Sequence, residues 1–254
     1  NLKVDWVRLE TPVPVGFWRS VGHSANAFSV EGFLDELAHA AGKDPLRFRL
    51  DMLGKDARSR RLLEVVAEKA GWGSPLPSGR GRGIARHTSF GSAVATVAEA
   101  SLDRSDGTIT VHRIVCAADC GPVINMDTAK AQLEGASLFG LSAALKEALS
   151  FGGGGVKSDN FHSYELLRMS EAPDVEAHLV DSDGPVGGLG EPAVPPVAPA
   201  VANAVFAAAG VRLRRLPMTP ESVLAAMRRV ERHRFVPDAQ CPYAYDDRPL
   251  PIGE

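Results

Sequence analysis

A short run of glycines that ends on a carboxylate constrains this chain more than any other stretch. Residues 187–192 read Gly-Gly-Leu-Gly-Glu-Pro. Glycines let the backbone adopt positive φ and let a bulky ligand approach closely, because no Cβ blocks either. Pro192 then stiffens the exit. A carboxylate fixed between a permissive and a rigid segment is placed as a general base should be, so Glu191 is the candidate catalytic residue; the alternative on spacing alone is a solvated loop glutamate.

Composition and charge exclude two classes of partner. The 254 residues carry a net charge of −3, and no arm or face gathers enough Lys and Arg to bind a phosphate backbone, so nucleic acid is not expected. No apolar run reaches the roughly eighteen residues of a membrane span. The chain begins at Asn1 rather than Met, so any targeting signal would lie upstream, and cytoplasm and periplasm both stay open as compartments.

The cysteines do not predict a metal site. Cys116, Cys120 and Cys241 give one close pair, whereas zinc would need two more ligands at suitable spacing. We therefore expect Cys116 and Cys120 to be buried thiols, and we expect no metal ligand from a side chain.

The hydrophobic periodicity predicts an α+β fold in which helices come first and strands and helices then mix. The Gly, Pro and Ser content of residues 71–83 favours a loop, and Asp103 to Gly107 favours the turn of an antiparallel hairpin. On the first helix, apolar residues that include Phe28, Val30, Phe33 and Leu37 recur at helical spacing, which predicts one face in the core. The expected helices are 26–41, 45–53, 57–70, 127–149 and 196–209, and the expected strands are 3–9, 94–102, 108–116 and 175–180. Asp44 and Asp56 are expected to begin the second and third helices, and Gly71 to end the third.

The glycine loop, followed by residues 197–204 (Val-Ala-Pro-Ala-Val-Ala-Asn-Ala), resembles the C-terminal signature of the molybdenum-binding subunit of the xanthine dehydrogenase and aldehyde oxidase family. The isoquinoline 1-oxidoreductase beta subunits are the branch that it resembles most. The resemblance implies that residues 1–217 are the C-terminal portion of a molybdopterin-binding domain. It also implies that Glu191 is the base beside the molybdenum.

Two further stretches carry this resemblance. Residues 19–22, Arg-Ser-Val-Gly, are similar to the family's Arg-Gly-x-Gly loop, with Ser20 in place of its first glycine. Residues 119–125 and 132–135 are similar to elements that line the pterin. The cofactor-binding residues implied by the family are Arg19, Gly22, Gly121, Asn125, Gln132 and Gly190. Residue type alone favours a surface arginine paired with a carboxylate for Arg19, and helix caps for the polar residues.

The resemblance also implies what lies outside these residues. The cofactor is a molybdopterin with molybdenum, in its cytosine dinucleotide form, and the iron-sulfur clusters belong to a small partner subunit. The family's glycine-rich phosphate loop and its Gly-Gln-Gly element are missing from this sequence. We therefore expect the N-terminal part of the molybdenum subunit to be a separate partner and the isolated chain to be inactive. The resemblance itself implies that the substrate is a small aldehyde or N-heteroaromatic compound.

The last part of the chain carries a second resemblance. Residues 223–253 are similar to the N-terminal segment of protein-L-isoaspartate O-methyltransferases, although the sequence ends before any S-adenosylmethionine loop. The expected second unit is thus residues 218–254, a helix with a Pro- and Tyr-rich tail. Two alternatives to the oxidoreductase interpretation remain open: a non-catalytic structural piece, and a truncated fusion to such a methyltransferase.

Overall fold

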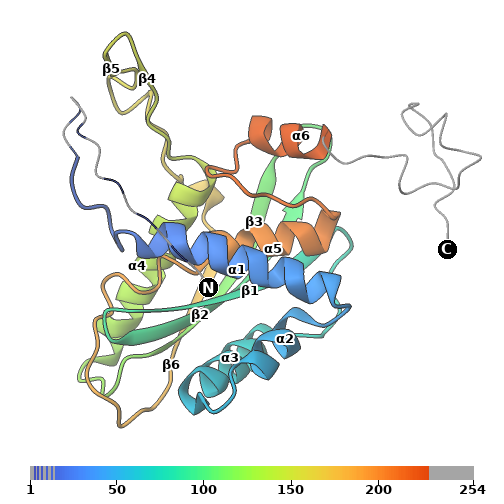
Figure 1. Ribbon diagram of the computed structural model, residues 1–254, viewed down its shortest axis with the longest axis vertical. Coiled ribbons are helices and arrows are strands. Elements are labelled where there is room, and N and C mark those ends of the chain that lie inside the picture. Colours follow the sequence, from blue (N-terminus) through green and yellow to red (C-terminus); the bar gives the residue numbers. More distant parts are fainter. Residues whose placement is uncertain are drawn as a thin grey trace, which may run out of the picture.

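A mixed sheet of four strands organises the computed structural model (Figure 1). The structure describes residues 15–228 and, before them, residues 3, 5, 7, 10 and 13. The strand order is β1-β2-β3-β6, in which the first three strands are antiparallel and β6 runs parallel to β3. The strands are β1 (Arg80–Ser89), β2 (Ser92–Leu102), β3 (Ile109–Asp119) and β6 (Asp174–Leu179). The prediction of an α+β fold is confirmed, with one parallel strand pair added to the antiparallel hairpin.

Six α-helices of the described region cover the sheet or pack on those that do. α3 covers one face, over the side chains of Ala95, Val97 and Val115, and α4 and α5 cover the other, over Ala98, Ile114 and Cys116. β2 is buried on both faces, which explains its run of small and β-branched residues. The helices are α1 (His23–Ala40), α2 (Pro45–Met52), α3 (Ala57–Ala70), α4 (Met126–Leu145), α5 (Val197–Ala209) and α6 (Pro220–Arg228).

α5 packs directly on the backbone of β1. A Cβ at Gly83 would overlap the carbonyl oxygen of Ala200, and a Cβ at Gly81 would overlap the backbone of Ala208. α5 consists mostly of alanine and valine, and most of its residues are buried. The predicted loop at residues 71–83 is confirmed up to residue 79 but wrong for residues 80–83, because Gly81 and Gly83 are strand residues that make room for a helix.

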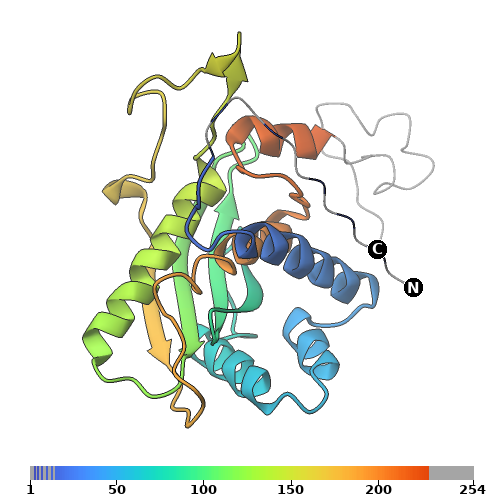
Figure 2. The same cartoon turned by 60° about the vertical axis from the view of Figure 1, so that its left-hand side comes forward.

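α1 lies across α5 (Figure 1, Figure 2). The exposures of its side chains show that acidic residues face inward. Glu31 and Asp35 are 5% and 4% exposed, whereas Val30, Phe33 and Leu37 are 56%, 60% and 38% exposed. The predicted core face was therefore wrong for these three apolar side chains. Periodicity identified the helix, but it could not tell which face is covered when an ion cluster lies beneath it.

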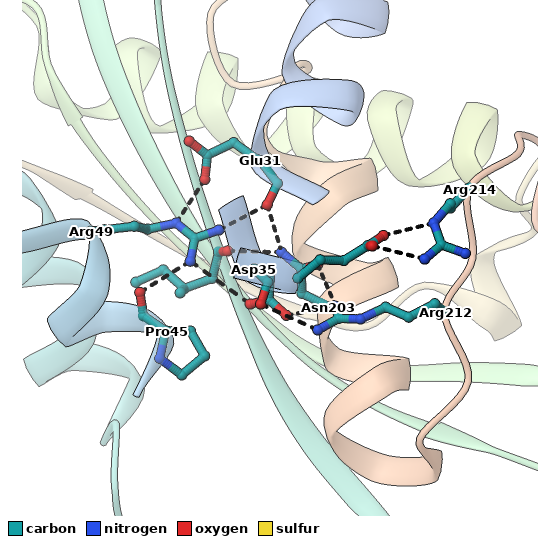
Figure 3. A network of polar contacts seen from close by, with 9 residues as sticks. Glu31, Asp35, Pro45, Arg49, Asn203, Arg212 and Arg214 are labelled. Atoms are coloured by element: carbon teal, nitrogen blue, oxygen red, sulfur yellow. Dashed lines mark hydrogen bonds and ion pairs between the residues drawn. The ribbon is translucent and has the colours of Figure 1, made fainter. Parts of the chain in front are cut away.

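That ion cluster joins α1, α2, α5 and the segment after α5 (Figure 3). Arg49, only 3% exposed, donates from Nε to Glu31 Oε2 at 2.8 Å and lies 3.8 Å from Asp35 Oδ1. Arg212 donates to Asp35 Oδ2 at 2.6 Å. Asn203 adds a bond to the Ile84 carbonyl of β1 at 3.2 Å. Each buried charge has an opposite charge beside it, so α1 is fixed against the layer below.

The remaining elements lie around this body. Residues between α4 and β6 form an arm that extends away from the sheet, with the short hairpin β4 (Phe151–Gly152) and β5 (Gly155–Val156) near its tip (Figure 1, Figure 2). The 3₁₀ helix η1 (Met169–Glu171) follows. α6 buries Val223 in the core cluster that includes Met218 and α5. Among the residues described, no helix is both long and apolar enough to cross a lipid bilayer.

The sequence predictions for the other elements agree closely. Asp44 and Asp56 cap α2 and α3 by accepting N–H bonds at 2.8 and 3.0 Å, and Gly71 ends α3 with φ 64°. α4 ends at Leu145, before the expected 149. Lys3, Asp5 and Val7 belong to no strand, and the rest of the strand expected at 3–9 lies outside the described residues. Residues 229–254, with Cys241 and most of the methyltransferase-like stretch, lie outside them too, and the boundary after residue 217 stays a prediction.

Gly83→Ala is expected to lower the free energy of unfolding by about 1–3 kcal/mol or more, because its Cβ meets helix backbone that cannot move aside. Thermal unfolding measures this effect. Gly32→Ala in α1 is the control, since a Cβ there meets nothing within 4 Å, and it should leave stability unchanged or raise it by up to about 1 kcal/mol. Equal effects of the two substitutions would contradict the packing described for α5 on β1.

Arg49→Met is expected to cost about 3–5 kcal/mol, because the carboxylates of Glu31 and Asp35 lose a buried partner. Arg214→Met is the matched control: it breaks an exposed pair with Glu36 and should cost less than about 1 kcal/mol. Chemical denaturation of both variants gives the comparison. Similar losses would mean that the buried cluster does not fix α1.

Candidate active site

The glycine loop connects β6 to α5 and is held by hydrogen bonds from two sides. Gly187 N–H donates to the Cys120 carbonyl at 2.9 Å, and Gly188 N–H donates to the Phe90 carbonyl at 2.8 Å. The Ser92 hydroxyl donates to the Gly188 carbonyl at 2.6 Å. A Cβ at Gly187 would lie 2.6 Å from the carbonyl carbon of Gly91, so only glycine allows the loop to lie this close to the β1–β2 turn.

Glu191 follows this loop and is half-buried. Its carbonyl accepts the Val194 N–H at 3.0 Å, and the next residues, Pro192 to Pro196, are buried on the way into α5. α4 packs against this segment at Gly140. A Cβ at this position would lie only 2.9 Å from the Val194 carbonyl oxygen, so glycine allows the close approach. The carboxylate is therefore carried by backbone that is fixed on both sides.

A loop near the N-terminus, formed by Arg19 and Ser20, also holds Glu191 in place. Ser20 N–H donates to Glu191 Oε1 at 2.8 Å, and the Ser20 hydroxyl donates to the Glu191 carbonyl at 2.7 Å. Arg19 donates from Nε to the Gly190 carbonyl at 2.7 Å and also from Nη2. Its guanidinium lies 5.3 Å from the ring centre of Phe139 on α4. Burial lowers the pKa of Arg19, and the Glu191 charge opposes this shift.

Ser20 stands where the resembled loop has glycine, yet its backbone keeps the conformation that glycine favours. Ser20 has φ 71° and Val21 has φ 49°, which costs an L-residue roughly 1–2 kcal/mol each. Ser20 is also fully buried. The sequence shows that serine replaces the glycine of the resembled loop. Only the structure shows what the serine adds, which is a hydrogen bond from its hydroxyl to the Glu191 carbonyl.

The other predicted cofactor residues fall into two groups. Gln132 is exposed beside Gly190, with its Oε1 3.8 Å from where a Gly190 Cβ would be, and Gly22 is the N-cap of α1 beside the Ser20 loop. Asn125 and Gly121 have structural contacts. Asn125 caps α4 by accepting the Thr128 N–H at 2.9 Å, and Gly121, at φ 74°, leaves room for the Pro185 carbonyl. Asn125 lies seven residues before Gln132, about two helical turns or about 10 Å away on the same side of α4.

The free donors around Glu191 fit a polar, anionic organic cofactor. Within the described part of the chain, the Gln132 amide has no hydrogen-bond partner, so it can both donate to and accept from a ring edge. The first turn of α1 has no acidic residue and no side-chain cap, which leaves its positive end available to an anion. No three His, Cys, Asp or Glu side chains in residues 15–228 gather closely enough to hold a metal ion.

Two histidines, His23 and His87, contact each other next to the Ser20 loop. His23 Nδ1 and His87 Nε2 are 2.9 Å apart. Burial, followed by the neighbouring charges of His23 and Arg86, lowers the pKa of His87 to about 4. His87 is thus uncharged at neutral pH.

The fold and the site together define an α+β cofactor-binding domain that carries one positioned carboxylate. The chain belongs to the molybdopterin cofactor-binding domain family, which matches residues 40–173. Gly121, Asn125 and Gln132 lie inside this match. Arg19, Gly22, Gly190 and Glu191 lie outside it, and the roles expected of them stay predictions.

Two relatives extend the similarity over most of the chain. The isoquinoline 1-oxidoreductase subunit beta of Brevundimonas diminuta is 35% identical over 231 residues, which cover 89% of this chain and 29% of that protein. The membrane-bound aldehyde dehydrogenase (pyrroloquinoline-quinone) of Gluconacetobacter polyoxogenes is 36% identical, over 84% of this chain and 30% of that protein. The chain thus spans less than a third of the length of these relatives.

A solved structure shares the fold. The aldehyde oxidoreductase from Desulfovibrio gigas superimposes with a TM-score of 0.69 at 16% sequence identity, over 83% of this chain and 41% of that one. The arrangement of sheet and helices expected for a molybdopterin-binding domain is therefore confirmed.

His87 predicts a pH dependence of stability. Its pKa in the folded protein, about 4, lies below the ordinary value near 6.5, so the unfolded chain takes up this proton first as the pH falls. The free energy of unfolding should therefore decrease between about pH 6.5 and 4. Denaturant titrations across this range should show a shallower decrease for His87→Gln than for the wild type. Parallel curves would contradict the assignment of this proton to His87.

Proposed function

We propose that this chain is part of a molybdenum-dependent oxidoreductase that hydroxylates a carbon of a small aldehyde or N-heteroaromatic compound, with Glu191 as the general base. One observation carries the proposal. Glu191 Oε1 accepts the Ser20 N–H, whereas Oε2 has no hydrogen-bond partner within the described residues. One oxygen is anchored and the other is free, which is the arrangement a base needs in order to accept a proton in a fixed direction.

The residues of this chain have separate roles in that reaction. Molybdopterin with molybdenum, when bound, would supply the oxidation chemistry. Glu191 Oε2 receives the proton that is released as the carbon is hydroxylated. Arg19 and Ser20 keep the Gly190–Glu191 backbone in place. Gln132 and the N-terminus of α1 bind polar edges of the cofactor.

The proposal includes two partner subunits and one form of the cofactor. The partners are the remaining part of the molybdenum subunit and a small iron-sulfur subunit that accepts the electrons, and the cofactor is in its cytosine dinucleotide form. The relative named as a subunit beta supports a multi-subunit assembly, and the 29% coverage supports a missing part of the subunit. Apolar side chains near the site give that part a surface to cover, since Ile124, next to Asn125, is 99% exposed and Met126 is also exposed.

Glu191→Gln in the complete enzyme is expected to lower kcat by about 10²- to 10⁴-fold without loss of fold or molybdenum. The amide oxygen still accepts the Ser20 N–H, but the side chain no longer takes up a proton. Steady-state rates with an aldehyde and with an N-heteroaromatic substrate, together with metal analysis, provide the test.

Glu68→Gln on the exposed face of α3 is the matched control and should leave kcat unchanged. A wild-type rate for Glu191→Gln would refute the proposed base. An assembled enzyme that never takes up molybdenum would support a non-catalytic structural role for the chain.

A further inference from the structure

The His23–His87 contact joins two elements that each hold Glu191. His23 is the first residue of α1, and its backbone N–H donates to the Ser20 carbonyl at 3.0 Å. Ser20 in turn donates to Glu191. His87 lies near the end of β1, three residues before Phe90, whose carbonyl accepts the Gly188 N–H.

The aromatic ring of Phe90 completes this contact. It lies 5.1 Å from the His23 ring in an edge-on arrangement, and the two histidine rings are also 5.1 Å apart. A closed path of contacts thus runs from Glu191 through Ser20, His23 and Phe90 to Gly188 and back along the glycine loop. Both loops around the carboxylate are tied together at the histidine pair.

Backbone strain gathers at the same place. Among the described residues, the non-glycine residues with positive φ are Ser20, Val21 and Phe90, at 71°, 49° and 51°. Such conformations persist only where the surroundings impose them, and they are common at functional sites. All three lie within three residues of His23 or His87 in the sequence, so the contacts of the histidine pair lie beside this strain.

We propose that the His23–His87 pair, with Phe90 packed on it, is a positioning element that keeps Ser20 N–H on Glu191 Oε1 and so aims Oε2. The proposal rests on the proposed function of Glu191. The pair needs a single proton between the two nitrogens, one ring donating and the other accepting. The low pKa of His87 supports this state at neutral pH.

The test uses the complete enzyme and two substitutions at each histidine. His87→Leu and His23→Leu remove the contact, whereas His87→Gln and His23→Asn place an amide close to where Nε2 and Nδ1 were. The leucine variants should lose about 10- to 100-fold in kcat with little change in KM, since misplacement of a base by about 1 Å costs this much. The amide variants should keep most of the rate. His39→Leu, at the other end of α1 against Phe206, is the control and should keep wild-type kcat.

Coupling separates positioning from general damage to the fold. The double variant His23→Leu/His87→Leu should be no slower than the slower single variant, because both remove one contact. In a Glu191→Gln background, His87→Leu should lower the residual rate no further, because the group being positioned no longer acts as a base. A merely structural role would still lower the residual rate in the Glu191→Gln background.

Each result decides between the two proposals. If His87→Leu does not fold, the His23 variants provide the same comparison. Leucine variants with wild-type kcat, or amide variants as slow as the leucine ones, overturn the positioning role. A slow Glu191→Gln enzyme with fast histidine variants overturns the positioning role alone, whereas a fast Glu191→Gln enzyme overturns the proposed function itself.

Discussion

The structure around Glu191 depends on the contact between two loops that are 171 residues apart in the sequence. Ser20 and Arg19 form four hydrogen bonds with Gly190 and Glu191, and two of them bind Glu191 through its side chain and its carbonyl. Neither loop forms a helix or strand at this point, and each leads into a helix, the first into α1 and the second into α5. The positions of α1 and α5 therefore set the distance between the two loops. The packing of these two helices therefore determines the geometry of the site.

Two different interactions fix those helices. α5 is held by contact with backbone, since the glycines of β1 let it approach closer than any side chain would allow. α1 is held by charge, because Glu31 and Asp35 meet Arg49 and Arg212 under the helix. Buried ion pairs add little net stability, but they tolerate only one geometry, since any shift leaves a charge without its partner. The helix that carries the Ser20 loop is thus fixed by the interaction that tolerates displacement least.

The sequence predicted what local chemistry determines. Asp44, Asp56 and Gly71 marked helix ends correctly, because a cap acts on the next few residues only. It failed where a distant element decides. Gly81 and Gly83 appear loop-like until α5 is placed on them, and Phe33 appears core-like until the ions beneath α1 are known. Glu191 and Arg19 could be proposed from their motifs, but the link through Ser20 and the histidine pair needs the folded chain.

Under the proposed function, the contacts of Arg19 indicate whether this domain mainly binds the cofactor or mainly orients Glu191. A guanidinium beside a cofactor could bind an anion directly, yet here two of its nitrogens donate to a backbone carbonyl next to Glu191. The other groups free to bind, Gln132 and the first turn of α1, are few and polar. Four hydrogen bonds from Arg19 and Ser20 hold Gly190 and Glu191, whereas few groups of the described residues stay free around the carboxylate. Under the proposed function, this chain therefore contributes mainly orientation, and most of the binding energy for the cofactor comes from outside these residues.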